Sequence, residues 1–154
     1  MFYVLALLLG ITAGLRAAMP LAALGWGAYL GWIDLSATWA SFVGNIAVVI
    51  VLTILAIVEL VGDQLPQTPS RKTPPQFAGR IVTGAVAGLV LGLPSGNWIA
   101  GLILGIVGAV IGTLGGAEVR KWLAGAFGRD LPAALIEDVI AIVVAFLAVH
   151  AMLA

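Results

Sequence analysis

Apolar residues dominate the chain in five long stretches that contain few charged side chains. A helix that crosses a hydrocarbon core of about 30 Å needs roughly 20 apolar residues, and each stretch is close to that length. The connections are short apart from residues 64–76, so we expect residues 1–154 to form a single integral membrane domain. The expected fold is all-α, a polytopic transmembrane helical bundle of about five spans. These spans are residues 2–25, 40–61, 77–93, 98–117 and 132–154.

The charged residues give this bundle an orientation. With five spans, the N-terminus, residues 62–80 and residues 118–131 share one side of the membrane, and nearly all basic residues fall there. Cytoplasmic loops carry an excess of Lys and Arg, and tryptophans favour the membrane interfaces. We therefore expect a cytoplasmic N-terminus and an outer C-terminus, with most tryptophans at the outer boundaries. The basic residues are Arg71, Lys72, Arg80, Arg120, Lys121 and Arg129, and the tryptophans are Trp26, Trp32, Trp39 and Trp98.

The composition narrows the class of protein further. Of the 154 residues, 62% are hydrophobic and 9% are charged, and the formal net charge is zero. This excludes a nucleic-acid-binding protein, which needs a basic surface, and a disordered chain, which needs low hydrophobicity. It also excludes a soluble domain, which needs more polar surface. Because there is no cysteine, disulfides, thiolate nucleophiles and Cys-ligated zinc are excluded as well. We expect a multi-pass membrane protein.

Glycines recur at every fourth position in several spans. Membrane helices associate through close backbone contact at such small residues. Two of these stripes lie on the consecutive spans 77–93 and 98–117, which are joined by a short turn, so these spans are expected to form a tightly packed hairpin. A second interpretation stays open, in which the missing side chains leave room for a substrate path. The stripes are Gly10 and Gly14; Gly84, Gly88 and Gly92; Gly101 and Gly105; and Gly108 and Gly112.

Four carboxylates lie near the cytoplasmic ends of two spans. Glu59 and Asp63 share a face at a helix C-terminus, where the helix dipole and their mutual repulsion disfavour them. Glu137 and Asp138 lie one turn into the last span, and at least one of them is expected to face the interior. An arginine, a metal ion or a bound proton should compensate these charges, because an unpaired carboxylate in a membrane is costly. The four acids are candidates for a divalent-cation or proton site, or for structural ion pairs.

Arg16 lies well inside the first span, where an unpaired charge is also costly. Pro20 follows four residues later and cannot donate the helical hydrogen bond to the Arg16 carbonyl. We therefore expect the first helix to be broken near Arg16 and Pro20, as in helices that line a cavity. The other interpretation is an arginine anchored to a lipid phosphate or to a partner carboxylate.

Five motifs occur in an order that resembles a known family. They are residues 14–21 (GLRAAMPL), 59–66 (ELVGDQLP), 68–71 (TPSR), 79–80 (GR) and 137–141 (EDVIA). Over nearly the whole chain they resemble the bacterial membrane proteins catalogued as domain of unknown function 4126, which have no established activity. One departure is Gln64, where the family pattern has Lys, and this puts a local salt bridge to Asp63 in doubt. The resemblance implies that the motif positions are Arg16, Glu59, Asp63, Arg71, Arg80, Glu137 and Asp138.

With this resemblance, the leading hypothesis is a small multi-pass protein of the bacterial inner membrane that acts as a transporter or channel for an ion or small solute. The four carboxylates would form its cation- or proton-handling site, and Arg16 its internal counter-charge or gate. We expect a homodimer, because five short spans offer little room for an enclosed pathway.

Two rival hypotheses belong to other classes. The runner-up is a metal-dependent membrane enzyme acting on a phospholipid or nucleotide-linked lipid, with carboxylate-bound Mg²⁺ beside Arg71, Lys72 and Arg80. It predicts a lipid-shaped groove that opens sideways to the bilayer. The third is a scaffold subunit whose charges form only structural pairs. No nucleophile–base pair or phosphate-cradling loop is recognisable, so no catalytic residue is named and a transporter is favoured over an enzyme.

Overall fold

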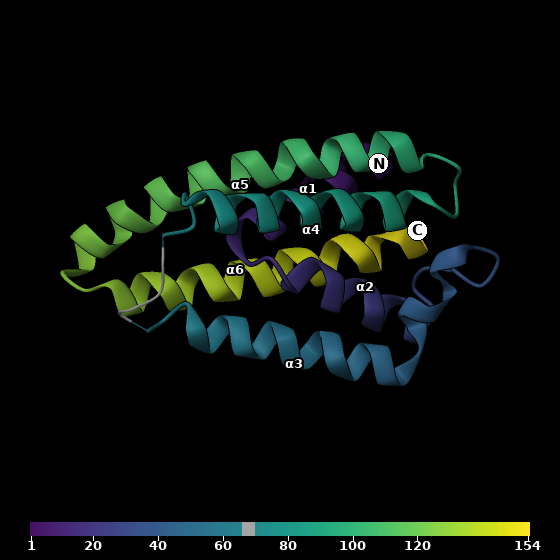
Figure 1. Ribbon diagram of the computed structural model, residues 1–154, viewed down its shortest axis with the longest axis horizontal. Helices are drawn as coiled ribbons and strands as arrows, with labels where there is room; N and C mark the ends of the chain where they lie inside the picture. Colours follow the sequence, from purple (N-terminus) through teal and green to yellow (C-terminus); the bar gives the residue numbers. More distant parts are fainter. Residues whose placement is uncertain (66–69) are drawn as a thin grey trace.

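The computed structural model of the protein describes residues 1–65 and 70–154, and within these ranges it contains helices and no strands (Figure 1). The all-α fold expected from the sequence is confirmed. Of the motif residues, Pro66 and residues 68–69 lie outside the described ranges. The α-helices are α1 (Phe2–Leu15), α2 (Met19–Tyr29), α3 (Ile46–Gly62), α4 (Pro74–Gly92), α5 (Trp98–Phe127) and α6 (Asp130–His150), and the short 3₁₀ helices are η1 (Trp39–Gly44) and η2 (Ala151–Leu153).

Two helices, α1 and α2, replace the first predicted span. Arg16 has an extended backbone, with φ −142° and ψ 109°, and this conformation ends α1. Pro20 occupies the first turn of α2, where its missing N–H is harmless because the first N–H groups of a helix have no partner within it. The expected break near Arg16 and Pro20 is therefore confirmed.

The α1 helix runs alongside α5 and in the same direction. At the start of both helices the Phe2 ring lies against Gly101, and further along Gly14 lies against Thr113. At its last residue α1 has reached the middle of the long α5 helix.

The α2 helix then runs back toward the end of the molecule at which α1 began. Arg16, just before α2, contacts Asp138 in the first half of α6, whereas Gly27 packs against Val149 near the end of α6. α2 therefore follows the direction of α6, and α6 is antiparallel to α5 (Figure 1). Since α1 follows α5, α1 and α2 form a hairpin, and residues 16–18 are its tip.

This reversal corrects the predicted topology. A single crossing by residues 2–25 would have put the N-terminus on the side of the basic residues and the C-terminus on the opposite side. Instead both termini lie at one end of the molecule (Figure 1). Arg71 and Arg120 contact Glu137 in the first half of α6, the half that lies away from the C-terminus. α1 is only 14 residues long, which is about 21 Å, before the chain turns back at Arg16. The predicted placement of the N-terminus beside the basic residues, with residues 2–25 as a crossing, is wrong.

Glycines bring α1, α4 and α5 into very close contact. In the α4–α5 hairpin, Gly84 lies on Gly105 and Gly88 lies on Gly101. A Cβ atom added to Gly88 would overlap the carbonyl of Gly101, so the two backbones fill the space between the helices. The expected hairpin is confirmed, and the alternative of a substrate path between these two stripes is wrong because no room is left there.

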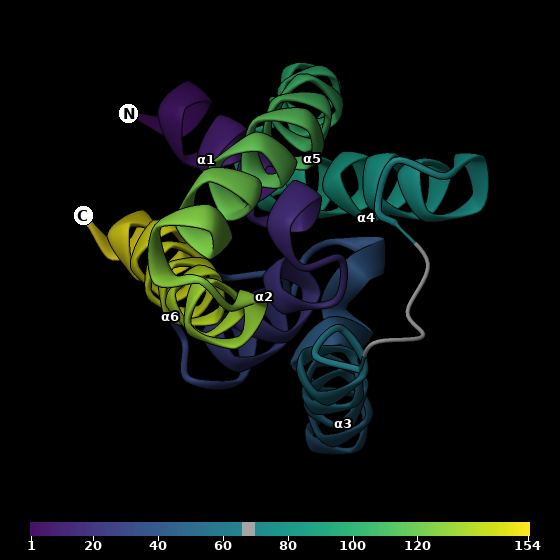
Figure 2. The same ribbon diagram turned by 90° about the vertical axis from the view of Figure 1, so that its left-hand side faces the viewer.

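The exterior of the bundle is apolar, and charges lie inside it. Val58, Val61 and Leu147 are more than half exposed, while Arg16 and Arg80 are buried. Within the described residues, two helical segments are long and apolar enough to cross a membrane, namely α5 and the continuous segment Asp130–Leu153. α1 and α3 are apolar but shorter, and α3 lies at the edge of the bundle beside α2 (Figure 1, Figure 2). Buried charges inside an apolar exterior are the arrangement expected of helices in lipid.

Candidate functional site

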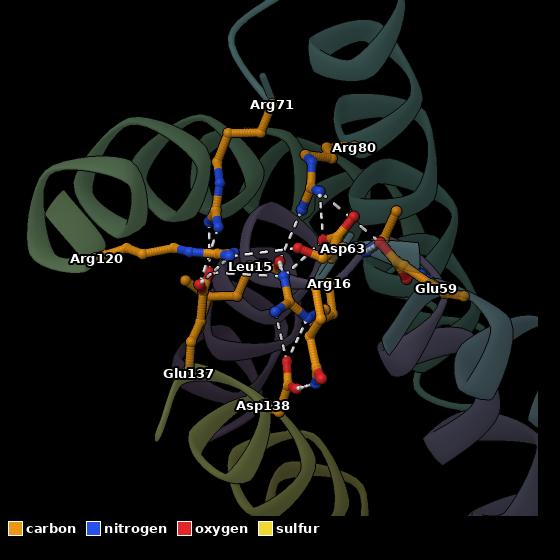
Figure 3. A network of polar contacts seen from close by, with 12 residues as sticks. Leu15, Arg16, Glu59, Asp63, Arg71, Arg80, Arg120, Glu137 and Asp138 are labelled. Atoms are coloured by element: carbon orange, nitrogen blue, oxygen red, sulfur yellow. Dashed lines mark hydrogen bonds and ion pairs between the residues drawn. The ribbon is translucent and has the colours of Figure 1, made fainter. Parts of the chain in front are cut away.

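Eight charged side chains meet around the hairpin tip, and we call them the charge cluster (Figure 3). They come from the tip, the end of α3, the segment before α4, and helices α4, α5 and α6. The structure brings together all seven site residues that were expected from the sequence and adds Arg120. The charge cluster consists of Arg16, Glu59, Asp63, Arg71, Arg80, Arg120, Glu137 and Asp138.

Arg16 lies at the centre of the charge cluster, and its side chain is fully buried. Its Nε donates a hydrogen bond to Asp138 Oδ1 at 2.6 Å, and its Nη2 lies 2.5 Å from the same oxygen. Its Nη1 donates to Asp63 Oδ2 at 2.6 Å and to the Leu15 carbonyl at 3.0 Å. One guanidinium therefore links the hairpin tip to α6 and to the end of α3. Of the two interpretations of Arg16, an anchor to partner carboxylates is the one that these contacts match.

Arg80 caps the C-terminal end of α1. Its Nη1 donates to the carbonyls of Gly14 and Leu15 at 2.9 and 2.8 Å, and the residue is only 3% exposed. The last carbonyls of a helix have no partner within it and carry the negative end of the helix dipole. A buried cation is therefore favourable at this position.

Glu59 caps the N-terminal end of α2. Its carboxylate accepts hydrogen bonds from the backbone N–H groups of Ala17 and Ala18 at 2.6 and 2.7 Å. Arg80 Nη2 is the nearest cationic group, at 3.8 Å. The positive end of the α2 dipole thus stabilises the Glu59 carboxylate, which the negative end of the α3 dipole disfavours. This backbone partner was not among the three compensating groups expected from the sequence.

Glu137 is buried among three arginines. Arg71 pairs with both of its carboxylate oxygens, with Nη2 donating to Oε2 at 2.9 Å and Nη1 donating to Oε1. Arg120 Nη1 lies 3.5 Å from Oε2, and Arg16 Nη1 lies 3.9 Å from Oε1. Gly116 makes the Arg71 contact possible, because a Cβ atom there would approach Arg71 Nη1 to 3.0 Å.

Sequence reasoning missed Arg120 because it ended the fourth span at Ala117. α5 continues as one helix of 30 residues, so Arg120 follows Gly116 by one turn and reaches Glu137. The continuing spacing of four, from Gly112 through Gly116 to Arg120, is the signal that could have found it.

Two further polar residues join the edge of the charge cluster. Arg120 donates to both carboxylate oxygens of Asp130, at 3.0 and 2.6 Å, and Asp130 is largely exposed. Gln64 donates to Asp138 Oδ2 at 3.0 Å. The residue that departs from the family pattern thus contacts Asp138 on α6.

The charge cluster balances its own charge with four arginines and four carboxylates. Each carboxylate accepts hydrogen bonds from an arginine or from backbone N–H groups. Among the residues that the structure describes, no group of three or more His, Cys, Asp or Glu is placed to hold a metal ion. The divalent cation expected at Glu59, Asp63, Glu137 and Asp138 stays a prediction. Chemically, the cluster can offer a carboxylate to a proton or cation when an arginine leaves that carboxylate.

An apolar groove of about 260 Å³ runs between α1, α5 and α6 and ends at the charge cluster. Arg120 and Glu137 are its only charged lining residues. The rest of the lining is aliphatic or glycine, so the groove joins an apolar surface to a buried polar site. Its apolar lining residues are Ile11, Leu15, Ile111, Gly112, Gly115, Gly116, Val119, Leu123, Ala133, Ile136 and Ile140.

No curated protein and no solved structure matches the chain. It does match, over residues 3–154, the family described as domain of unknown function (DUF4126). The match includes every residue of the charge cluster and confirms the resemblance drawn from the motifs. The chain therefore belongs to the DUF4126 family.

Proposed function

We propose that the protein is integral to a bacterial inner membrane, with α3, α4, α5 and α6 crossing the bilayer and the α1–α2 hairpin re-entering it from one side. The apolar exterior and the buried charges support this placement. α3 and α4, with 17 and 19 residues, extend roughly 26 and 29 Å, close to the thickness of the hydrocarbon core. The positive-inside rule assigns the end with Lys72, Lys121 and Arg129 to the cytoplasm and both termini to the outside.

In this placement the protein transports an ion or small solute, and the hairpin tip is its gate. The observation that carries the proposal is Arg16, a fully buried arginine on a non-helical tip, bonded to Asp63 and Asp138. Non-helical backbone at membrane depth is tolerated only where protein buries it or where it lines a cavity. In many transporters, helix ends and non-helical backbone within the membrane form the substrate and ion sites.

The packing indicates which part of the bundle moves. α1 is held to α5 by glycine contacts, whereas α3 packs chiefly against α2 and η1. A shift of α3 would separate Asp63 from Arg16 and would withdraw Glu59 from the tip. Each carboxylate would then lose its compensating partner and attract a proton or cation from the cytoplasm. Arg16 competes with that cargo for Asp63, and the backbone N–H groups at the tip compete with it for Glu59.

Currents in proteoliposomes test this proposal. The purified protein is reconstituted, and charge movement is recorded on a solid-supported membrane after imposed gradients of H⁺, Na⁺, K⁺ and Cl⁻. Glu59→Gln keeps the size of the side chain and removes its charge, and we expect it to reduce the wild-type current at least about tenfold, which corresponds to roughly 1.4 kcal/mol. Glu118→Gln is the matched control, because Glu118 is an exposed carboxylate that pairs with Lys72 outside the charge cluster.

Three results would contradict the proposal. The first is a full current in a folded Glu59→Gln variant, and the second is an equal loss in Glu118→Gln. The third is a wild-type protein that carries no current under any of the four gradients.

A lipid-active enzyme is the second candidate function, because the apolar groove ends at Arg120 and Glu137. It ranks second since the described residues place no three acids for a metal ion. Phosphatidylglycerol turnover that requires Mg²⁺, stops with EDTA and needs no gradient would favour the enzyme over the transporter.

A homodimer completes the proposal, because so small a bundle encloses little space for a pathway on its own. Light scattering of the purified protein in detergent measures the protein mass. Twice the chain mass of 15.7 kDa is expected, and a mass equal to one chain contradicts the dimer.

A further inference from the structure

The apolar groove between α1, α5 and α6 opens toward the exterior of the bundle. Ile111, Val119 and Ile140 line it and are about half exposed, so the groove is continuous with the surface that we assign to lipid. From Ile111 to Leu123 it follows α5 for about 18 Å along the helix axis. Its lining there is apolar, and its volume is about 260 Å³. The groove therefore suits a single extended chain.

The floor of the groove is formed by three glycines of α5, and they differ in what covers them. A Cβ atom at Gly112 would overlap the backbone of Ile11, and one at Gly116 would approach Leu15. At Gly115 a Cβ atom would meet nothing within 4 Å. The groove is thus open over Gly115, and no other part of the described chain fills it there.

The polar end of the groove supplies a guanidinium. Arg120 lies in the lining, and its bonds to Asp130 reach a side chain that is 59% exposed. Lys121 and Trp122, the next residues on α5, are exposed, and tryptophans favour the depth of the lipid headgroups. An arginine fork binds a phosphate as readily as a carboxylate. A phosphate at this depth can therefore replace the exposed Asp130 on Arg120.

We propose that this groove binds one acyl chain of an anionic phospholipid from the cytoplasmic leaflet, with the lipid phosphate on Arg120. The apolar walls match the chain, and the Arg120 guanidinium matches the lipid phosphate once Asp130 has left it. The inference rests on the membrane placement proposed above but not on transport. It adds a lipid ligand whose headgroup touches the edge of the charge cluster.

Native mass spectrometry tests the inference with two added lipids, phosphatidylglycerol and phosphatidylcholine, at equal concentration. Gly115→Leu fills the open part of the groove without a clash of its Cβ atom. We expect it to lower phosphatidylglycerol retention about tenfold, as the loss of roughly two buried methylene groups would. Gly79→Leu is the matched control, because Gly79 is also helical, exposed and free of neighbours within 4 Å of an added Cβ atom, but lies on α4 away from the groove.

A second variant tests the position of the headgroup. Asp130→Asn weakens the carboxylate that competes for Arg120, so we expect phosphatidylglycerol retention to rise by about twofold to fivefold, the range of an exposed ion pair. A fall in retention would overturn the placement of the phosphate on Arg120.

The remaining outcomes are equally decisive. Wild-type retention in Gly115→Leu, or an equal loss in Gly79→Leu, would overturn the groove as the binding site. Equal retention of the two lipids by the wild type would overturn the preference for an anionic headgroup. If Gly115→Leu instead dissociates a dimer, the groove belongs to a second copy of the chain and the lipid proposal fails. Proteoliposome currents report separately on transport, so either proposal can fail while the other stands.

Discussion

Replacing Arg16 by methionine should be the most damaging single change in the charge cluster. The substitution keeps an unbranched side chain and removes the cation. Among the described residues, Asp138 then keeps only Gln64 as a partner, so a buried carboxylate is left without a cation. Removing one partner of a buried ion pair costs about 3–5 kcal/mol, against a total stability of about 5–15 kcal/mol for a folded domain. Arg16→Met should therefore lose about a fifth or more of the free energy of unfolding.

The second-site variant Asp138→Asn separates an unpaired charge from a general packing defect. If the damage in Arg16→Met comes from the orphaned carboxylate, neutralising Asp138 should recover about 2 kcal/mol, within the range of coupling energies between contacting residues. Asp138→Asn alone should be milder, because Arg16 keeps its bond to Asp63. If a packing defect causes the damage, the losses of unfolding free energy in Arg16→Met and Asp138→Asn should simply add in the double variant.

Equilibrium unfolding in mixed micelles, followed by tryptophan fluorescence, measures these free energies. Lys72→Met is the control, because Lys72 pairs with Glu118 at the surface, and such exposed pairs contribute about 0–1 kcal/mol. The reasoning is refuted if Arg16→Met stays within about 1 kcal/mol of the wild type, the limit for that surface control. It is also refuted if Asp138→Asn deepens the loss in the double variant.

Two more predictions concern packing and titration. Gly88→Ala should destabilise the protein by about 1–3 kcal/mol, the usual cost of overpacking, because the added Cβ atom overlaps the Gly101 carbonyl. Gly79→Ala is the control and should not destabilise the protein, because its Cβ atom meets nothing within 4 Å. Equilibrium unfolding in micelles measures the free energy of unfolding of both variants. The Ser36 hydroxyl and N–H donate to Asp34 and hold the pKa of that carboxyl below its usual range, so Ser36→Ala should raise the pKa in an NMR titration. The stability that this lowered pKa contributes is present above the normal carboxyl pKa and is lost as the pH falls through the folded-state pKa.

The break in the first helix and the need for partners at the buried charges could be predicted, because both follow from local energetics. Arg71 and Arg80 were implied by the family resemblance, and Arg120 was missed. Pro20 leaves the Arg16 carbonyl without its helical donor, and buried charges at Arg16, Glu59 and Glu137 each require a partner. The glycine contacts followed from spacing alone. What could not be read locally is which partner each charge takes. The capping of α2 by Glu59 depends on a backbone that exists only after the chain has turned.

The reversal at Arg16 escaped prediction because hydropathy measures the length of an apolar stretch and not its direction. Residues 2–25 are long enough for one crossing, and the same residues also make two shorter helices. The choice between these depends on contacts far apart in the sequence, such as Gly14 against Thr113 and Gly27 against Val149. One missed reversal moves the N-terminus to the other end of the molecule. It does not change how residues 62–80 and 118–131 are placed relative to each other. The prediction that these two basic segments share one end of the molecule is therefore unaffected.

Two helix ends meet at the hairpin tip, and each is capped by a side chain from another helix. The two helices that supply these side chains differ in how tightly they pack against the rest of the bundle. Arg80 caps the carbonyl end of α1 from α4, and α4 is fixed to α5 by glycine contacts. Glu59 caps the amide end of α2 from α3, which lies at the edge of the bundle and packs chiefly on α2 and η1. A displacement of α3 therefore removes the partner of the amide end and leaves the carbonyl end capped. For this reason, neutralising Glu59 tests the proposed gate, whereas neutralising Arg80 would mainly test the stability of the tip.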